Sequence, residues 1–242
     1  MVEIDIHLCS MRLINVEAFL GRERLIGQGK RVDHRAKVLE FDDDEVTEYA
    51  ILSHRWIEQE VDYNEVVKLA KMNEEERTEI RQRDGYQKIL QSCKQANKDG
   101  CKWLWVDTCC IDKRSSSELS EAINSMYRWY ENSRICYAYL HDVPGSSFPT
   151  MTEGYRYPKS NGWPEWFSRG WTLQEMIAPR DVQFFNKDWH PIGNKHLCWN
   201  TSLEFHSVHW RRDFPQTVHA LPKSCHGQPV GRRLEWRTGL IL

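Results

Sequence analysis

Three apolar runs, each ending abruptly in polar or aromatic residues, restrict the folds that are open to this chain. They cover residues 49–56, 103–112 and 134–140, and residues 181–186 form a similar fourth run. Short apolar runs bounded by turn residues are typical of strands that are buried on both faces of a parallel sheet. We therefore expect an α/β fold with a mostly parallel sheet and flanking helices.

Helical patterns separate the first three runs. Apolar residues recur at helical spacing in residues 86–96, before Asp99-Gly100, and again in residues 119–130. Ser115 and Glu118 indicate a capping box at the start of the second helix. A helix between each pair of strands predicts right-handed crossovers and parallel pairing. The second helix is expected to bury Leu119, Ala122, Ile123, Met126, Tyr127 and Tyr130.

Polar side chains stand where the first two runs end. Ser53, His54, Arg55 and Trp56 close the first run, and Asp107 follows the apolar part of the second. Parallel sheets bind ligands at the carboxyl ends of their strands, so these residues are candidates for substrate binding. Asp107 suits a catalytic acid, an acceptor for ribose hydroxyls or the cap of a turn. For His54 the alternative is a structural role.

Residues 166–175 carry two tryptophans, an arginine and a carboxylate within one short segment. If a helix opens at Trp171, Glu175 lies at position i+4 on the same face, so that the indole and the carboxylate project together into one cleft. The alternative interpretation is structural, with Trp171 in the core and Glu175 either solvated or paired with Arg169.

Composition excludes several function classes. The chain has 242 residues, 40% of them hydrophobic, and a formal net charge of −2. It therefore lacks the surplus of clustered Lys and Arg that a dedicated nucleic-acid-binding protein needs to bind the phosphate backbone. No apolar run reaches the length of a membrane span, and residues 1–20 lack the features of a signal peptide. We expect a cytoplasmic protein without nucleic-acid or membrane partners.

The eight cysteines are expected to be reduced, because disulfides are rare in intracellular proteins. The four in residues 93–110 contain no C-x-x-C pair, so no metal site is predicted. Cys93 is expected to pack in the core. A hydrolase in which His54 activates Ser53 or Cys109 remains a distant alternative.

The sequence predicts one domain, residues 1–195, followed by a divergent tail. Asp42-Asp43-Asp44-Glu45 indicates a solvated loop, and residues 68–84 indicate an exposed helix or linker. Residues 196–242 carry six Lys or Arg against three Asp or Glu and show no clear periodicity. We expect this tail to be poorly structured.

Five blocks stand in a fixed order along the chain: YAILSHRW (49–56), GYQKI (85–89), WLWVDTCCIDK (103–113), SELSEAINSM (117–126) and RGWTLQE (169–175). Together they closely resemble the fungal heterokaryon incompatibility (HET) domain, and the resemblance spans residues 11–195. The subclass is the one found at the amino terminus of fungal NLR-type receptors. The resemblance implies a domain that triggers programmed cell death in nonself recognition, with another copy of itself or an NLR-type receptor as its partner.

The chain departs from the family pattern at three places. Ile57 stands where the family usually has glycine, so the loop there is expected to be less tight. Residues 68–84 are longer and more charged than expected. The resemblance stops after Lys195, for which a retained intron or frameshift is one hypothesis, and on that hypothesis the protein is truncated and inactive. One uninterrupted exon in the transcript would refute it.

A more remote resemblance concerns mechanism. The strand–helix order and the Trp171-x-x-x-Glu175 spacing are similar to TIR domains, some of which hydrolyse NAD with the glutamate of a W-x-x-x-E motif. The resemblance implies a TIR-like or flavodoxin-like three-layer fold. Glu175 would stabilise an oxocarbenium-like state or hold ribose hydroxyls. Trp171 or Trp56 would stack on a base, and Arg55 or Arg169 would pair with pyrophosphate.

NAD would then be a substrate, because the chain has no Rossmann glycine fingerprint, and no cofactor is expected. The main alternative is a noncatalytic signalling module. In that interpretation a tryptophan-rich surface drives homotypic assembly and Glu175 is structural.

Overall fold

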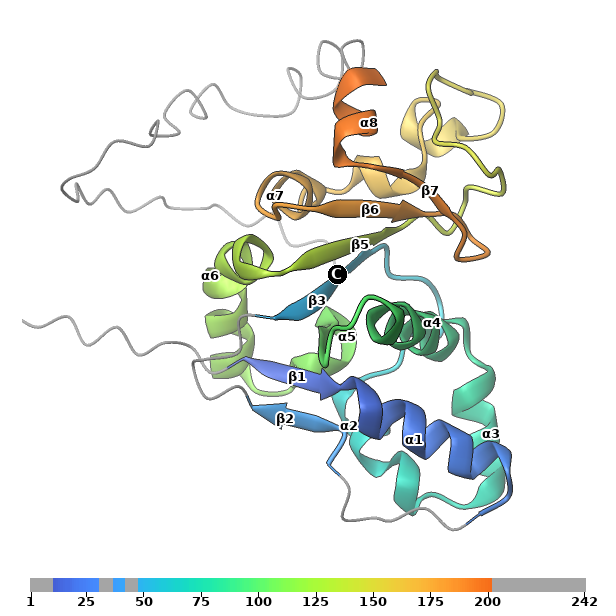
Figure 1. Ribbon diagram of the computed structural model, residues 1–242, viewed down its shortest axis with the longest axis vertical. Coiled ribbons are helices and arrows are strands. Elements are labelled where there is room, and N and C mark those ends of the chain that lie inside the picture. Colours follow the sequence, from blue (N-terminus) through green and yellow to red (C-terminus); the bar gives the residue numbers. More distant parts are fainter. Residues whose placement is uncertain (1–10, 31–36, 42–47, 202–242) are drawn as a thin grey trace, which may run out of the picture. The chain divides into compact units, whose positions relative to one another are not determined.

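The computed structural model describes residues 11–30, 37–41 and 48–201. Within them a seven-stranded sheet has the order β2-β1-β4-β3-β5-β6-β7. The expected α/β class, with a mostly parallel sheet and flanking helices, is confirmed (Figure 1). The strands are β1 (Arg12–Asn15), β2 (Leu39–Phe41), β3 (Tyr49–His54), β4 (Trp103–Trp105), β5 (Ile135–Tyr139), β6 (Val182–Phe185) and β7 (Pro191–Asn194).

The four central strands are parallel. β3 pairs with β4 on one side and with β5 on the other, and β5 pairs with β6. β1, β2 and β7 add antiparallel edges. Numbered along the chain, the parallel strands have the order 2-1-3-4, as in flavodoxin-like sheets. The strand order reverses between β3 and β5, because the chain runs from β3 to β4 on one side and then returns to β5 on the other. A ligand crevice is therefore expected at the carboxyl ends of β3 and β5.

Right-handed crossovers divide the helices between the two faces. The chain passes from β3 to β4 in one direction and from β4 to β5 in the other, which places the connecting helices α4 and α6 on opposite faces. α1 packs against α4, and α6 packs against α7 (Figure 1). The α-helices are α1 (Val16–Gly27), α2 (Tyr63–Lys68), α3 (Glu74–Gln82), α4 (Asp84–Lys98), α5 (Asp107–Cys110), α6 (Ser116–Asn132), α7 (Thr172–Ile177) and α8 (Lys195–Thr201).

The second apolar run is a shorter strand than its sequence indicates. β4 ends at Trp105, and Asp107–Cys110 forms the single turn α5. Val106 is extended, and its carbonyl oxygen accepts the N–H groups of Cys109 and Cys110 at 3.3 and 2.8 Å. The backbone thus turns at Asp107, whose type competes with a strand by favouring turns. Asp107 is the first residue of this turn and not its cap.

Residues 11–30 contain a strand and a helix that periodicity did not resolve. Asn15 ends β1 and caps α1, accepting the Ala18 N–H at 3.0 Å. β1 pairs with both β2 and β4, so its contacts are long-range and leave no local signal. Residues 68–84 form two helical segments whose Leu69 and Ile80 are buried.

The last part of the chain is described only in its first residues. α8 begins at Lys195 and buries Cys198, so residues 196–201 are helical where little structure was expected. The remainder of the tail lies outside the described residues, as does the Asp42–Glu45 loop.

The predicted core face of α6 is only partly buried. Ala122 and Tyr130 are buried as expected, but Ile123 and Tyr127 are 42% and 43% exposed. Trp129 is buried in their place and lies 5.5 Å from the ring of Trp105. The apolar stripe of α6 is wider than the surface that the sheet covers. At the amino end of α6 the Ser115 hydroxyl accepts the Glu118 N–H at 3.3 Å, which is one half of the predicted capping box. The Glu118 carboxylate does not return to the Ser115 N–H, because it accepts from the Arg12 guanidinium and the Asp112 backbone N–H.

Candidate functional site

Glu175 on α7 lies at the end of β3 and has its two carboxylate oxygens engaged. The Ser53 hydroxyl donates to Oε2 at 2.6 Å, and Arg169 donates to Oε2 and Oε1 at 3.0 and 3.3 Å. Glu175 is only 3% exposed. The predicted residues Ser53, Arg169 and Glu175 are therefore brought together in one hydrogen-bonded cluster.

An aromatic cluster positions this group. Trp166 is fully buried and donates its indole N–H to the Ser53 hydroxyl at 2.8 Å. Its ring lies 5.7 Å from that of Phe184 on β6. The Thr172 hydroxyl donates to the Trp166 carbonyl oxygen at 2.7 Å, which ties the start of α7 to the same segment. Ser53 is thus held between Trp166 and Glu175.

Burial dominates the electrostatics of this cluster. It raises the pKa of Glu175 above the ordinary value for a glutamate, while Arg169 and the Ser53 hydroxyl act in the opposite direction. A buried carboxyl group with a raised pKa at the end of a parallel strand has the character of a functional group.

A second cluster surrounds His54. The Nε2 atom of this buried side chain lies 3.6 Å from Oδ1 of Asp107 and 3.9 Å from Oε2 of Glu60. Glu60 is held in turn by Lys88, whose ammonium group donates to Oε1 at 2.5 Å. Because side chains alternate along a strand, Ser53 and His54 point to opposite faces of β3. The two clusters thus lie on either side of the sheet at one strand end.

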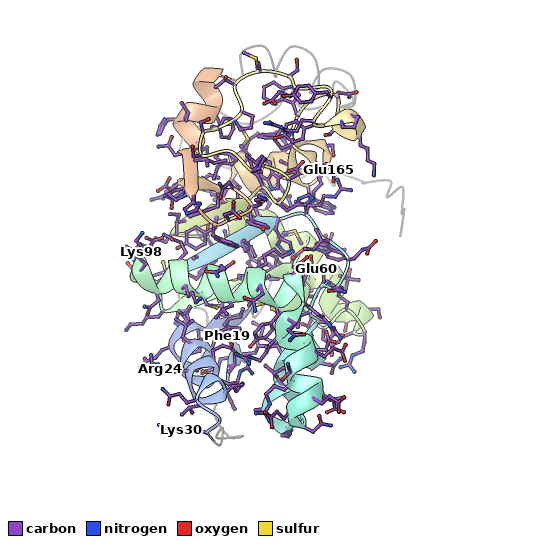
Figure 2. All side chains as sticks on the ribbon, turned by 90° about the vertical axis from the view of Figure 1, so that its right-hand side faces the viewer. Phe19, Arg24, Lys30, Glu60, Lys98 and Glu165 are labelled. Atoms are coloured by element: carbon purple, nitrogen blue, oxygen red, sulfur yellow. The ribbon has the colours of Figure 1, made fainter. Side chains whose placement is uncertain are left out.

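Lys88 is a buried cation on α4. Burial lowers its pKa, and Glu60 acts against that shift. Figure 2 shows Glu60 beside the amino-terminal end of α4, whereas Lys98 marks the other end of this helix. The approach is close because Gly85 has no side chain. A Cβ atom there would lie 2.6 Å from the Gln59 carbonyl oxygen and 2.7 Å from Glu60 Cα.

Replacing Gly85 with alanine should therefore destabilise the protein by about 1–3 kcal/mol, because backbone atoms would have to move. Gly21→Ala is the matched control, since Gly21 lies within α1 and a Cβ there would meet nothing within 4 Å. The control should stabilise by roughly 0.5–1 kcal/mol through helix propensity. Urea unfolding of the two variants measures both effects. Stabilisation by both would show that the Gln59–Glu60 loop does not need Gly85.

Burial lowers the pKa of His54 well below 6.5, and the nearby cations Lys88, Arg169 and Lys113 act in the same direction. Asp107 and Glu60 face it as well, but the pKa is still lowered, which favours the neutral imidazole. A lowered folded-state pKa gives stability that is present above the unfolded pKa and is lost as the pH falls. We expect this one group to cost about 1.4 kcal/mol of stability per pH unit as the pH falls below 6.5.

His54→Gln should remove this contribution, so that unfolding free energies measured between pH 7 and pH 5 decline less steeply in the variant. Parallel curves for the variant and the parent would show that His54 does not titrate differently in the folded and unfolded states.

The remaining predicted binding residues are placed less centrally. Arg55 pairs with Glu165. Trp56 is 50% exposed and donates its indole N–H to Oδ2 of Asp107 at 2.7 Å. Trp171 is 44% exposed at the N-cap of α7, whereas Glu175 is buried. The two side chains therefore do not share one environment, because Trp171 is exposed and Glu175 is buried. Of the structural alternative, the pairing of Glu175 with Arg169 is seen, but Trp171 is not in the core.

The cysteine and serine nucleophiles do not pair with His54. The Ser53 hydroxyl donates its hydrogen bond to Glu175 instead. Cys109 is buried, and its hydrogen bond with Cys110, together with burial, raises the pKa of its thiol far above the ordinary value. Cys93 is buried on α4 as expected. A protonated, buried thiol is a poor nucleophile.

Sequence reasoning missed Glu60, Lys88 and Trp166. Lys88 lies in one of the five blocks and Trp166 opens the tryptophan-rich segment, so each had a signal that was not assigned a role. Glu60 stands in a loop with no motif. Among the residues that the structure describes, no group of three or more His, Cys, Asp or Glu has a geometry suited to a metal ion.

Fold and site together define a doubly wound α/β protein with a polar cluster at the carboxyl ends of its central strands. Residues 49–162 match the family model "Heterokaryon incompatibility protein (HET)". The chain is also 43% identical, over 154 residues and 61% of its length, to the vegetative incompatibility protein HET-E-1 of Podospora anserina. It thus carries a HET domain, and the identification from the five blocks is confirmed.

The chain matches only a small part of this relative. The aligned region spans 10% of the length of the Podospora protein. No solved structure matches the chain. Within the described ranges, none of the helices combines the length and apolar character needed to cross a membrane.

Proposed function

We propose that this domain is an effector of fungal heterokaryon incompatibility, which triggers cell death by hydrolysing the nicotinamide glycosidic bond of NAD, with Glu175 as the catalytic carboxylate. One observation carries the proposal. Glu175 is a buried carboxyl group with a raised pKa, placed at the point where the strand order reverses and ligands bind in sheets of this type.

The chemistry fits a carboxylate at this position. Departure of neutral nicotinamide leaves positive charge on the ribose, and an ionised Glu175 stabilises that charge. Water then adds to the ribose carbon and loses a proton, giving ADP-ribose. Arg169 has a second role, because a pyrophosphate that draws its guanidinium away frees Glu175 from the ion pair seen at 3.0 Å.

A noncatalytic assembly module is the second candidate, and a separate observation favours it. Ile123 and Tyr127 on α6 and Trp171 on α7 are all more than 40% exposed, and the two helices pack against each other. Exposed aromatic and aliphatic side chains on adjoining helices suit homotypic contact or an NLR-type receptor partner. In this case Glu175 serves only to hold Ser53 and Arg169.

Release of free nicotinamide from NAD by the purified chain separates the two. The chain is fused to an inducible oligomerisation module, so that assembly is imposed, and Glu175→Gln is compared with the parent. Glu23→Gln is the matched control, because Glu23 is also a buried glutamate paired with an arginine, Arg81 at 3.0 Å, but on α1.

We expect nicotinamide release from the parent and from Glu23→Gln, and a loss of at least about 100-fold in Glu175→Gln. An assembled parent that leaves NAD intact, or equal rates in the parent and Glu175→Gln, would refute the catalytic proposal.

A further inference from the structure

Three buried polar atoms in the His54 cluster have no hydrogen-bond partner. They are Nε2 of His54, Oε2 of Glu60 and Oδ1 of Asp107. Both oxygens lie within 3.9 Å of the same imidazole nitrogen, so the three atoms surround one small region. Buried polar groups are nearly always paired, since an unpaired one costs about 1–3 kcal/mol. An unpaired trio is therefore a candidate site for a hydrogen-bonding ligand.

The second oxygen of each carboxylate is held in place. Oε1 of Glu60 accepts from Lys88 at 2.5 Å and from the Ile57 N–H at 2.9 Å. Oδ2 of Asp107 accepts from the Trp56 indole at 2.7 Å. Each carboxylate thus presents one fixed, unsatisfied oxygen to the same region, and this arrangement is the preorganisation that a binding site requires.

The chemistry of the trio selects its ligand. Two carboxylate oxygens repel an anion and accept hydrogen bonds from donors. The ammonium of Lys88 offsets part of the local negative charge, which favours a neutral donor over a cation. Hydroxyl groups are neutral donors, and the two adjacent hydroxyls of a ribose can address two acceptors together. We infer that His54, Glu60 and Asp107 form a subsite for the ribose hydroxyls of the nucleotide, an inference that rests on the proposed function.

The position of this subsite agrees with a ligand that crosses the end of the sheet. Asp107 influences the pKa values of both Glu175 and Arg169, and Arg169 influences that of His54, so the two clusters are electrostatic neighbours. A ribose held by the trio leaves Glu175 for the developing positive charge and Arg169 for the pyrophosphate. In this arrangement Asp107 and Glu60, and not Glu175, accept the hydrogen bonds of the ribose hydroxyls.

Trp56 borders the subsite through its hydrogen bond to Asp107. The three unpaired atoms are buried, and the indole of Trp56 is held by Asp107 on one side and by the Lys113 ammonium, 3.8 Å from the ring centroid. Half of the Trp56 side chain is already exposed, so its displacement costs little burial. A movement of the ring that keeps the indole N–H on Oδ2 leaves Oδ1 of Asp107 for a ligand hydroxyl.

The test compares two ligands on the full chain, by calorimetry in the Glu175→Gln background. The ligands are NAD and its analogue that lacks the 2′-hydroxyl of the nicotinamide ribose. We expect the analogue to bind roughly 10-fold more weakly, because it leaves one carboxylate oxygen unpaired. In Asp107→Asn the two ligands should bind with equal affinity. Asp112→Asn is the matched control, a half-buried carboxylate paired with Arg114, and should keep the discrimination.

Equal affinities in the background protein would overturn the inference without any variant of the subsite, so that a misfolded Asp107→Asn does not weaken the test. Binding that disappears on addition of a chelator would also overturn it, because a metal would then occupy the trio. Binding and turnover separate the two proposals. Discrimination without nicotinamide release by the parent refutes only the catalytic function, whereas release without discrimination refutes only the subsite.

Discussion

Arg169→Leu should lower the free energy of unfolding at pH 7 by about 3–5 kcal/mol, because it leaves Glu175 as an unpaired charge in a buried site. Both Arg169 contacts to the carboxylate would be lost, and only the Ser53 hydroxyl would remain as a partner. Chemical denaturation of the variant and the parent measures this loss. The double variant Arg169→Leu, Glu175→Leu should recover most of it, since neither charge then remains buried.

The pH dependence gives this prediction a sign. Burial already raises the pKa of Glu175, and removing the Arg169 cation raises it further. A raised folded-state pKa gives stability that is present below the unfolded pKa and is lost as the pH rises through the folded pKa. The defect of Arg169→Leu should therefore be largest near neutral pH and shrink towards pH 4.5. A defect of the same size at both pH values would contradict the assignment of a buried ionised carboxylate.

Trp166→Ala should cost about 3–5 kcal/mol of stability, whereas Trp171→Ala should change it by about 0.5 kcal/mol or less. The two tryptophans lie in the same short segment but differ in burial. Trp166 is fully enclosed and packs on Phe184 and Phe167, while Trp171 is 44% exposed. Thermal or urea unfolding compares them directly.

Trp166→Phe refines this comparison. It keeps a ring but loses the indole N–H that bonds to Ser53 at 2.8 Å, so an intermediate loss is expected. Similar losses for the two alanine variants would mean that Trp171 packs in the folded state as tightly as Trp166.

The elements that sequence predicted well are those with a local signal. The central strands and α4 and α6 follow from apolar periodicity and from turn residues such as Gly100, whose φ of 74° suits glycine. β1 and β7 were missed because strands of four residues carry little periodicity. The partner β4 of β1 also lies far away in the chain.

The candidate site was predicted in part for the same reason. Ser53, His54 and Asp107 stand where apolar strands end, and the strand order brings these ends together. Lys88 and Glu60, which support these residues, come from α4 and from the loop after β3, and neither segment carries a strand-end signal. Their pairing depends on how closely α4 approaches the loop after β3, and Gly85 sets that distance.

The sequence by itself determined the HET identity, the parallel α/β class and the strand ends that carry polar residues, because these depend on local spacing and block order. Only the tertiary structure decided that Glu175 is enclosed by Ser53 and Arg169 and that Trp171 faces outwards. It also decided that three polar atoms without hydrogen-bond partners face one another. Burial and pairing are set by segments far apart in the chain, and their distances arise only when the helices pack on the sheet.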